Sequence, residues 1–142
     1  MNKKGFTLIE LLVVIAIIGL LSTLAVVALG SARAKARDAK RLSDLKQVQT
    51  ALELYYTDNN AYPTAAAAVT LGSDTQACLN SDGFAATGCA NAYMAAVPAD
   101  PGSNSYAYTS ADGTTYSIAA TLESAVNGLS EGITASPSGI AD

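Results

Sequence analysis

The sequence predicts an α+β chain: one long N-terminal helix, at about residues 6–59, packed against a small C-terminal antiparallel β-sheet at residues 105–135. Three observations predict this fold. An apolar run near the N-terminus passes into a segment whose apolar residues recur every three or four positions, as on one face of a helix. Turn-forming residues then end the helix. Beyond them, alternation of large and small residues indicates β-strands.

The first half of the predicted helix is apolar on every side. Leu11 to Leu29 is 19 residues with no charge, and at about 1.5 Å per residue it spans roughly 28 Å, close to the hydrocarbon core of a bilayer. A secretory signal peptide would have a shorter apolar core. Glu10 lies at the edge of the run, where a lone carboxylate is costly unless it finds a positive partner. We therefore expect a membrane or buried helix.

The residues before this run form a motif. Lys3, Lys4, Gly5, Phe6, Thr7, Leu8 and Glu10 match a short basic leader that ends in glycine, followed by phenylalanine, with glutamate at the fifth position after the glycine. This pattern closely resembles the N-terminal signal of type IV pilins and of the related type II secretion pseudopilins. The match is tightest over residues 3–29. The competing interpretation is a single-span membrane protein in which Glu10 has no special role.

The resemblance implies a processing event and an assembly site. A prepilin peptidase would remove the leader, residues 1–5, between Gly5 and Phe6 and methylate the new amine of Phe6. Residues 6–30 would then form the transmembrane and filament-core half of a pilin-like helix. In a filament core with little water, Glu10 would pair with the Phe6 amine of a neighbouring subunit. Breaking such a pair would cost about 3–5 kcal/mol, because it leaves a buried charge without its partner.

The second half of the helix, residues 31–60, is predicted to be amphipathic. Five apolar residues recur at steps of three and four and should seat the sheet on one stripe. They are Leu42, Leu45, Val48, Leu52 and Tyr55. Six positive and two negative residues lie between Arg33 and Lys46. We expect this basic segment to be a solvated helix face.

The side of the membrane on which the C-terminal domain lies is left open by the residues themselves. Only two basic residues precede the apolar run and six follow it, so the positive-inside rule places the domain in the cytoplasm, whereas the resemblance implies export. Cys78 and Cys89 bear on this choice. In an exported domain we expect a disulfide that closes a 12-residue loop and stabilises by about 3 kcal/mol. In the cytosol two free thiols are expected.

The globular domain, residues 61–142, begins where the turn residues around Pro63 end the helix. Residues 64–104 are predicted to be a long connecting region with one short helix at Ala90 to Ala96. Asn127-Gly128 predicts a turn before a third strand at residues 129–135. The tail at residues 136–139 is expected to be flexible.

The strongest strand signal lies at residues 105–122, around a turn at Asp112-Gly113. A two-residue loop there would place the tyrosines of the two strands on opposite faces, while a three-residue loop, Ala111 to Gly113, would place them on one face. Because the buried face determines register, we expect the three-residue loop with a left-handed Gly113. Four large residues would then share the buried face: Tyr106, Tyr108, Tyr116 and Ile118.

Charge and composition limit the function. All eight Lys and Arg lie in residues 1–46, and nine acidic residues lie beyond them, which disfavours nucleic acid as a partner. The chain has no histidine, and it shows neither a phosphate-binding loop nor a zinc pattern, so we expect no enzyme and no cofactor. Asp100, Asp112 and Glu123 are weak candidates for calcium ligands, but a solvated acidic surface is the favoured interpretation.

The main hypothesis is a structural subunit of a type IV pilus or pilus-like filament, serving adhesion or twitching motility. The alternatives are the major pseudopilin of a type II secretion or competence system, which serves protein secretion, and a minor or tip subunit that binds a target. The implied partners are other copies of the chain in a helical homopolymer, the prepilin peptidase, an inner-membrane assembly platform and, before assembly, membrane lipid. The chain would be a single-pass inner-membrane protein and then part of an extracellular or periplasmic filament.

Overall fold

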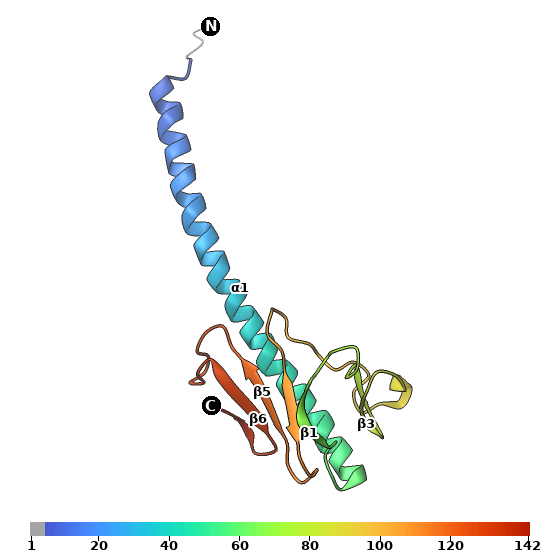
Figure 1. Cartoon of the computed structure of the whole chain (residues 1–142). Helices are drawn as coiled ribbons and strands as arrows, with labels where there is room; N and C mark the ends of the chain where they lie inside the picture. The colour runs from blue at the N-terminus through green and yellow to red at the C-terminus, as the bar shows by residue number, and fades with distance from the viewer. Residues whose placement is uncertain (1–4) are drawn as a thin grey trace. The chain divides into compact units, whose positions relative to one another are not determined.

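The computed structural model describes residues 5–142, so Lys3 and Lys4 of the predicted leader lie outside the described residues. The chain divides into two compact units, Met1–Ala34 and Lys35–Asp142. One helix, α1 at Leu8–Asn59, contributes to both (Figure 1). The long helix and the α+β class are confirmed. The helix begins two residues later than predicted, because Phe6 and Thr7 are not helical.

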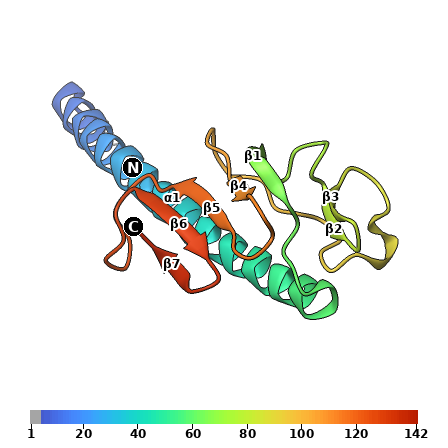
Figure 2. The same ribbon diagram turned by 60° about the horizontal axis from the view of Figure 1, so that its bottom comes forward.

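The second unit contains a five-stranded antiparallel sheet in the order β1-β4-β5-β6-β7 (Figure 2). Its strands are β1 (Ala65–Thr70), β4 (Ala107–Ser110), β5 (Ser117–Thr121), β6 (Gly132–Ser136) and β7 (Gly139–Ala141). A separate hairpin of β2 (Cys78–Asn80) and β3 (Gly83–Ala85) lies beyond the β1 side of the sheet and is followed by a 3₁₀ turn, η1 (Cys89–Asn91).

The predicted stripe of α1 forms the helical side of the core. Leu45, Val48 and Leu52 have no exposed surface, Tyr55 is 8% exposed, and Leu42 is partly buried against the same cluster. The sheet contributes residues from one face, since burial alternates along β4, β5 and β6. They include Tyr106, Tyr108, Tyr116, Ile118, Ala120, Ile133 and Ala135. The interpretation of the stripe as the seat of the sheet is confirmed.

The turn between β4 and β5 is longer than predicted but keeps the predicted face. Tyr108 pairs with Ile118, whereas the three-residue loop would have paired Tyr108 with Tyr116. The shift is two residues, and side chains alternate with a period of two, so the same residues still face the core. Gly113 is left-handed, with φ 76°, as predicted.

The prediction that residues 64–104 form a connecting region was wrong. This region supplies the edge strand β1, the β2–β3 hairpin and η1. The short helix expected at Ala90 to Ala96 is also wrong, since only the single turn η1 forms there. The sequence gives no local signal for β1. This strand consists of four alanines, Val69 and Thr70, a composition that favours helix over strand.

The C-terminal region follows the turn prediction and departs from the tail prediction. Asn127 and Gly128 both have positive φ, at 54° and 83°, and Val126 bridges to Leu129 across them, as expected for a tight primed turn. The third predicted strand exists as β6 at Gly132–Ser136. The tail expected to be flexible instead turns β6 back into β7, with Ser136 opposite Gly139.

Candidate functional site

The predicted cleavage point lies in exposed, non-helical chain. Gly5, Phe6 and Thr7 precede α1, and the Phe6 side chain is 84% exposed. Thr7 caps the helix together with Glu10. The Thr7 backbone N–H and hydroxyl each donate to the Glu10 carboxylate at 2.7 Å, and the Glu10 N–H approaches the Thr7 hydroxyl oxygen at 3.4 Å. This reciprocal pair is a capping box, which satisfies N–H groups that the first helical turn leaves free.

The apolar half of α1 has no cover within its own unit. Every large apolar side chain from Leu8 to Leu29 is roughly half exposed or more. Among the described residues, α1 is the one helix that is long and apolar enough to cross a membrane. A patch of this extent is unusual on a soluble monomer and marks an interaction with lipid or protein.

The basic segment is not the solvated face that its composition suggests. Three of its charged residues are buried: Asp38 is 0%, Arg41 1% and Asp44 4% exposed. The Arg41 guanidinium donates to Asp38 at 2.8 Å, to Asp100 at 2.6 and 3.0 Å, and to Glu123 at 2.8 Å. Arg41 thus joins α1 to two loops that lie far away in sequence. Its fork geometry suits such multiple pairing.

Asp38 completes this cluster on the side of the loop between β5 and β6. Its carboxylate accepts the backbone N–H groups of Glu123 and Ser124 at 2.8 and 3.0 Å, and the Ser124 hydroxyl at 3.0 Å. Arg37 adds a two-pronged ion pair with Glu123. We call Arg37, Asp38, Arg41, Asp100 and Glu123 the arginine cluster.

Protonation of the arginine cluster follows from these contacts. Burial favours the neutral acid at Asp38, but hydrogen bonds from the Glu123 and Ser124 backbone and from Arg41 hold the pKa of Asp38 below its ordinary value. Arg41 lowers the pKa of Asp100 in the same way. Arg37 first and Arg41 second lower the pKa of Glu123 to about 2. All three carboxylates therefore stay charged across the physiological range.

The structure does not bring the three calcium candidates together. Asp100 and Glu123 are engaged by Arg41, whereas Asp112 lies in the β4–β5 loop and accepts from the Thr114 backbone and hydroxyl. Within residues 5–142 no group of three or more His, Cys, Asp or Glu side chains is placed to hold a metal ion. The geometry assigns Asp100 and Glu123 a structural role in the arginine cluster instead.

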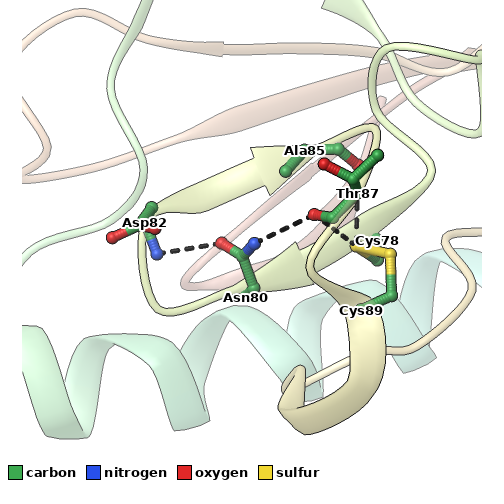
Figure 3. The surroundings of a disulfide bond; sticks show 6 residues. All are labelled: Cys78, Asn80, Asp82, Ala85, Thr87 and Cys89. Atoms are coloured by element: carbon green, nitrogen blue, oxygen red, sulfur yellow. Dashed lines mark hydrogen bonds between the residues drawn. A yellow bond between two sulfur atoms is a disulfide. The ribbon is translucent and has the colours of Figure 1, made fainter.

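Cys78 and Cys89 form the disulfide that the sequence predicted, with their Cα atoms 5.7 Å apart (Figure 3). The bridge ties the start of β2 to η1. Asn80 braces the loop inside the bridge: its side-chain amide donates to the Thr87 carbonyl at 3.3 Å, and its side-chain oxygen accepts the Asp82 N–H at 2.9 Å. The β2–β3 hairpin is therefore held by a covalent link as well as by its ladder.

Two protein-family models match the chain. Residues 1–30 match the prokaryotic N-terminal methylation motif, which covers Gly5, Phe6 and Glu10. Residues 28–131, more than half of the chain, match the family model of type II secretion system protein G. The chain belongs to the type II secretion system protein G family. The resemblance to pilins and pseudopilins inferred from the motif is thereby confirmed.

Curated relatives agree with this family. A type II secretion system core protein G of Vibrio cholerae is 33% identical over 113 residues, which are 77% of this chain and 72% of the relative. That of Pseudomonas aeruginosa is 34% identical over 75% of this chain and 73% of the relative. The Aeromonas hydrophila protein is 44% identical over only 44% of either chain. No solved structure matches the chain. The relatives favour the pseudopilin alternative over the pilus subunit of the main hypothesis.

The arginine cluster is the part of the site that sequence reasoning missed. Arg41 finds its partners 59 and 82 residues further along the chain, and no local pattern reports such separations. One signal was present. Arg41, Leu45, Val48 and Leu52 follow one another at steps of three and four, so Arg41 continues the apolar stripe by one turn. A charged residue on a buried stripe predicts a buried partner.

Proposed function

We propose that the chain is the major pseudopilin of a type II secretion system, a structural subunit that polymerises through its apolar N-terminal helix. The observation that carries this proposal is the uncovered surface of α1 from Leu8 to Leu29, which directly follows the Gly5-Phe6 step and Glu10. A monomer can hide this surface only in lipid. Packing of many such helices hides it in protein instead, with small residues such as Ala16 and Gly19 permitting close approach.

The geometry at the start of α1 supports processing between Gly5 and Phe6. The step is exposed and non-helical, and a peptidase needs extended chain to bind its substrate. Cleavage would leave Thr7 and Glu10 on the mature chain, so the capping box can persist after the leader is lost. The new amine of Phe6 then lies one residue before the cap. In an assembly without bulk water, the Phe6 amine of one subunit would neutralise Glu10 of the next.

The Cys78–Cys89 disulfide supports an exported domain, because disulfides persist in oxidising compartments and are rare in the cytosol. The chain would first be a single-pass inner-membrane protein with its domain outside the cytoplasm. It would then be extracted by an inner-membrane assembly platform into a filament. The basic segment that argued for the opposite topology is partly neutralised, since Arg37, Lys40 and Arg41 all pair with carboxylates of the chain itself.

Isolation of native assemblies that contain the chain tests this proposal. Electron microscopy should show filaments when the secretion genes of the same organism are expressed, and mass spectrometry of those filaments should find a chain that begins at N-methylated Phe6. Filaments built from subunits that retain Met1 to Gly5, or a chain that never leaves the membrane under these conditions, would contradict it.

A further inference from the structure

A cleft of about 430 Å³ lies between the end of α1 and the turn of the β2–β3 hairpin. Its volume falls in the range of small ligand sites. Aromatic and polar side chains line it together, including Tyr55, Asn59, Tyr62, Gln76, Asp82 and Phe84. Neither the family match nor the proposed polymerisation through residues 6–30 gives this cleft a role.

Tyr55 is the unusual member of this lining. The side chain is 8% exposed, and its hydroxyl, which makes no hydrogen bond to any of the residues from 5 to 142, is the part that keeps contact with solvent. The other tyrosine of the lining, Tyr62, donates its hydroxyl to Glu53 at 2.9 Å. Burial raises the pKa of Tyr55, with the charge of Asp82 adding to it. The Tyr55 hydroxyl is therefore neutral, close to a carboxylate, and free to accept a hydrogen bond.

The charge around the cleft selects the sign of a ligand. Asp82 lines it, Glu53 holds the hydroxyl of Tyr62, and Asp58 precedes Asn59 on the last turn of α1. None of these three carboxylates has an ion pair in the described part of the chain, and no Lys or Arg occurs beyond residue 46. Aromatic rings with adjacent carboxylates favour an ammonium or guanidinium group. The carboxylates would repel an anion.

The chain itself offers such cations. Arg33 and Lys35 are exposed and make no ion pair with a described residue, unlike Arg37, Lys40 and Arg41. Lys46 is also unpaired, but it shares a separate hollow with Glu53 of its own helix. Within the second unit, Lys35 and Asn59 are 24 residues apart on α1, which is about 36 Å along the axis. A single copy cannot bring its own Lys35 to its cleft.

We propose that the cleft receives a basic side chain from the Arg33–Lys35 stretch of a second copy of this chain. The contact is head-to-tail, because the donor and the receptor are different surfaces, and repetition of such a contact builds an open filament. It requires contacting copies to be offset by about 36 Å along their helix axes. The inference rests on the proposed polymerisation and assigns it a second contact, made by the globular domain.

Charge exchange in the full-length chain tests the proposal, with sheared-filament yield as the readout. Arg33→Glu/Lys35→Glu should lower the yield roughly tenfold, and so should Asp82→Lys. Combining the three substitutions should restore at least half of the loss, since the pair is re-formed with reversed sign. Tyr55→Phe should lower the yield without loss of the fold. Lys46→Glu and Glu131→Lys are controls that each reverse one charge outside the contact, and they should assemble normally.

A photo-cross-linking amino acid at position 82 gives an independent readout. In wild-type-like filaments it should capture the peptide that contains Arg33 and Lys35 of another copy. Capture of a different protein, or normal filament yield from both Asp82→Lys and the Arg33/Lys35 double variant, would overturn the inference and leave the proposed function intact. Absence of filaments from the wild-type chain in its native system would overturn both.

Discussion

Arg41 is the residue on which the second unit depends most. It is 1% exposed and forms ion pairs with three carboxylates. Two of them lie on loops of the sheet: Asp100 before β4 and Glu123 after β5. Buried ion pairs add little to stability compared with an apolar replacement of the whole set, but removal of one partner leaves the others charged and desolvated. Arg41 therefore acts as the neutralising centre for Asp38 and Asp100.

We expect Arg41→Met to lower the free energy of unfolding by about 3–5 kcal/mol, because methionine fills much of the space but leaves two buried carboxylates without a cation. Urea unfolding of the full chain in detergent micelles, followed by tyrosine fluorescence, measures this change. Lys46→Met is the matched control. Lys46 is exposed and makes no ion pair with a described residue, so the cost should stay below about 1 kcal/mol. An equal loss of unfolding free energy in both variants would contradict the role of Arg41 in neutralising Asp38 and Asp100.

Glu123 makes the stability of the second unit sensitive to acid. Its pKa is about 2 in the folded chain against an ordinary value of 4.5, so the unfolded chain binds the proton first. The contribution is fully present above about pH 4.5 and is lost as the pH falls toward 2. Glu123→Gln should flatten the dependence of the melting temperature on pH in this window. Glu131→Gln is the control, because Glu131 is exposed and has no ion pair. If Glu123→Gln left the dependence of the melting temperature on pH unchanged, Glu123 would not be the source of the acid sensitivity.

At the scale of elements, the sequence predicted the parts whose signal is local. The stripe of α1, the strand pair β4–β5 and the left-handed Gly113 all follow from spacing or turn chemistry. It failed at β1, which consists mostly of alanine and becomes a strand only because β4 offers a free edge. It also failed at β7, a three-residue strand that depends on β6. Both depend on a partner strand, which a local pattern cannot report.

Gly113 allows the β4–β5 loop to close against the segment that follows α1. Its φ is 76°, and a Cβ there would lie 3.0 Å from the carbonyl oxygen of Tyr62. Gly113→Ala should therefore destabilise by about 1–2 kcal/mol. Gly132→Ala is the control, because no atom lies within 4 Å of the added Cβ. Thermal unfolding of both variants checks this, and similar melting temperatures would show that the loop relaxes without strain.

The disulfide fixes the β2–β3 hairpin that forms one wall of the cleft. Replacing Cys78 and Cys89 by serine should cost about 3 kcal/mol, since the 12-residue loop is then free in the unfolded chain. Reduction of the wild-type chain should lower its melting temperature by the same amount as the double substitution. In freshly isolated cells neither cysteine should react with an alkylating reagent before reduction. Ready labelling of both would place the domain in the cytosol.

At the scale of the whole molecule, membership of the pilins and pseudopilins could be predicted from residues 3–29, because the motif combines a glycine, a carboxylate and an apolar run. Pilus and pseudopilus could not be separated in this way, since both use the same motif. Residues 28–131 decided the family match. Charge distribution is the remaining global feature. Among the described residues, the cations without ion pairs precede residue 47, and all carboxylates without ion pairs except Glu10 follow it.

We propose that residues 6–30 assemble the filament through Glu10. A single chain satisfies the Glu10 carboxylate with Thr7, but a packed core also requires a positive charge from a neighbour. The most direct test is sheared-filament yield relative to total membrane protein for Glu10→Ala, Glu10→Gln and the control Ser22→Ala. We predict normal insertion and cleavage for all three, poor assembly for both Glu10 variants with Ala at least as defective as Gln, and normal assembly for Ser22→Ala. Normal filament yield from both Glu10 variants would contradict it.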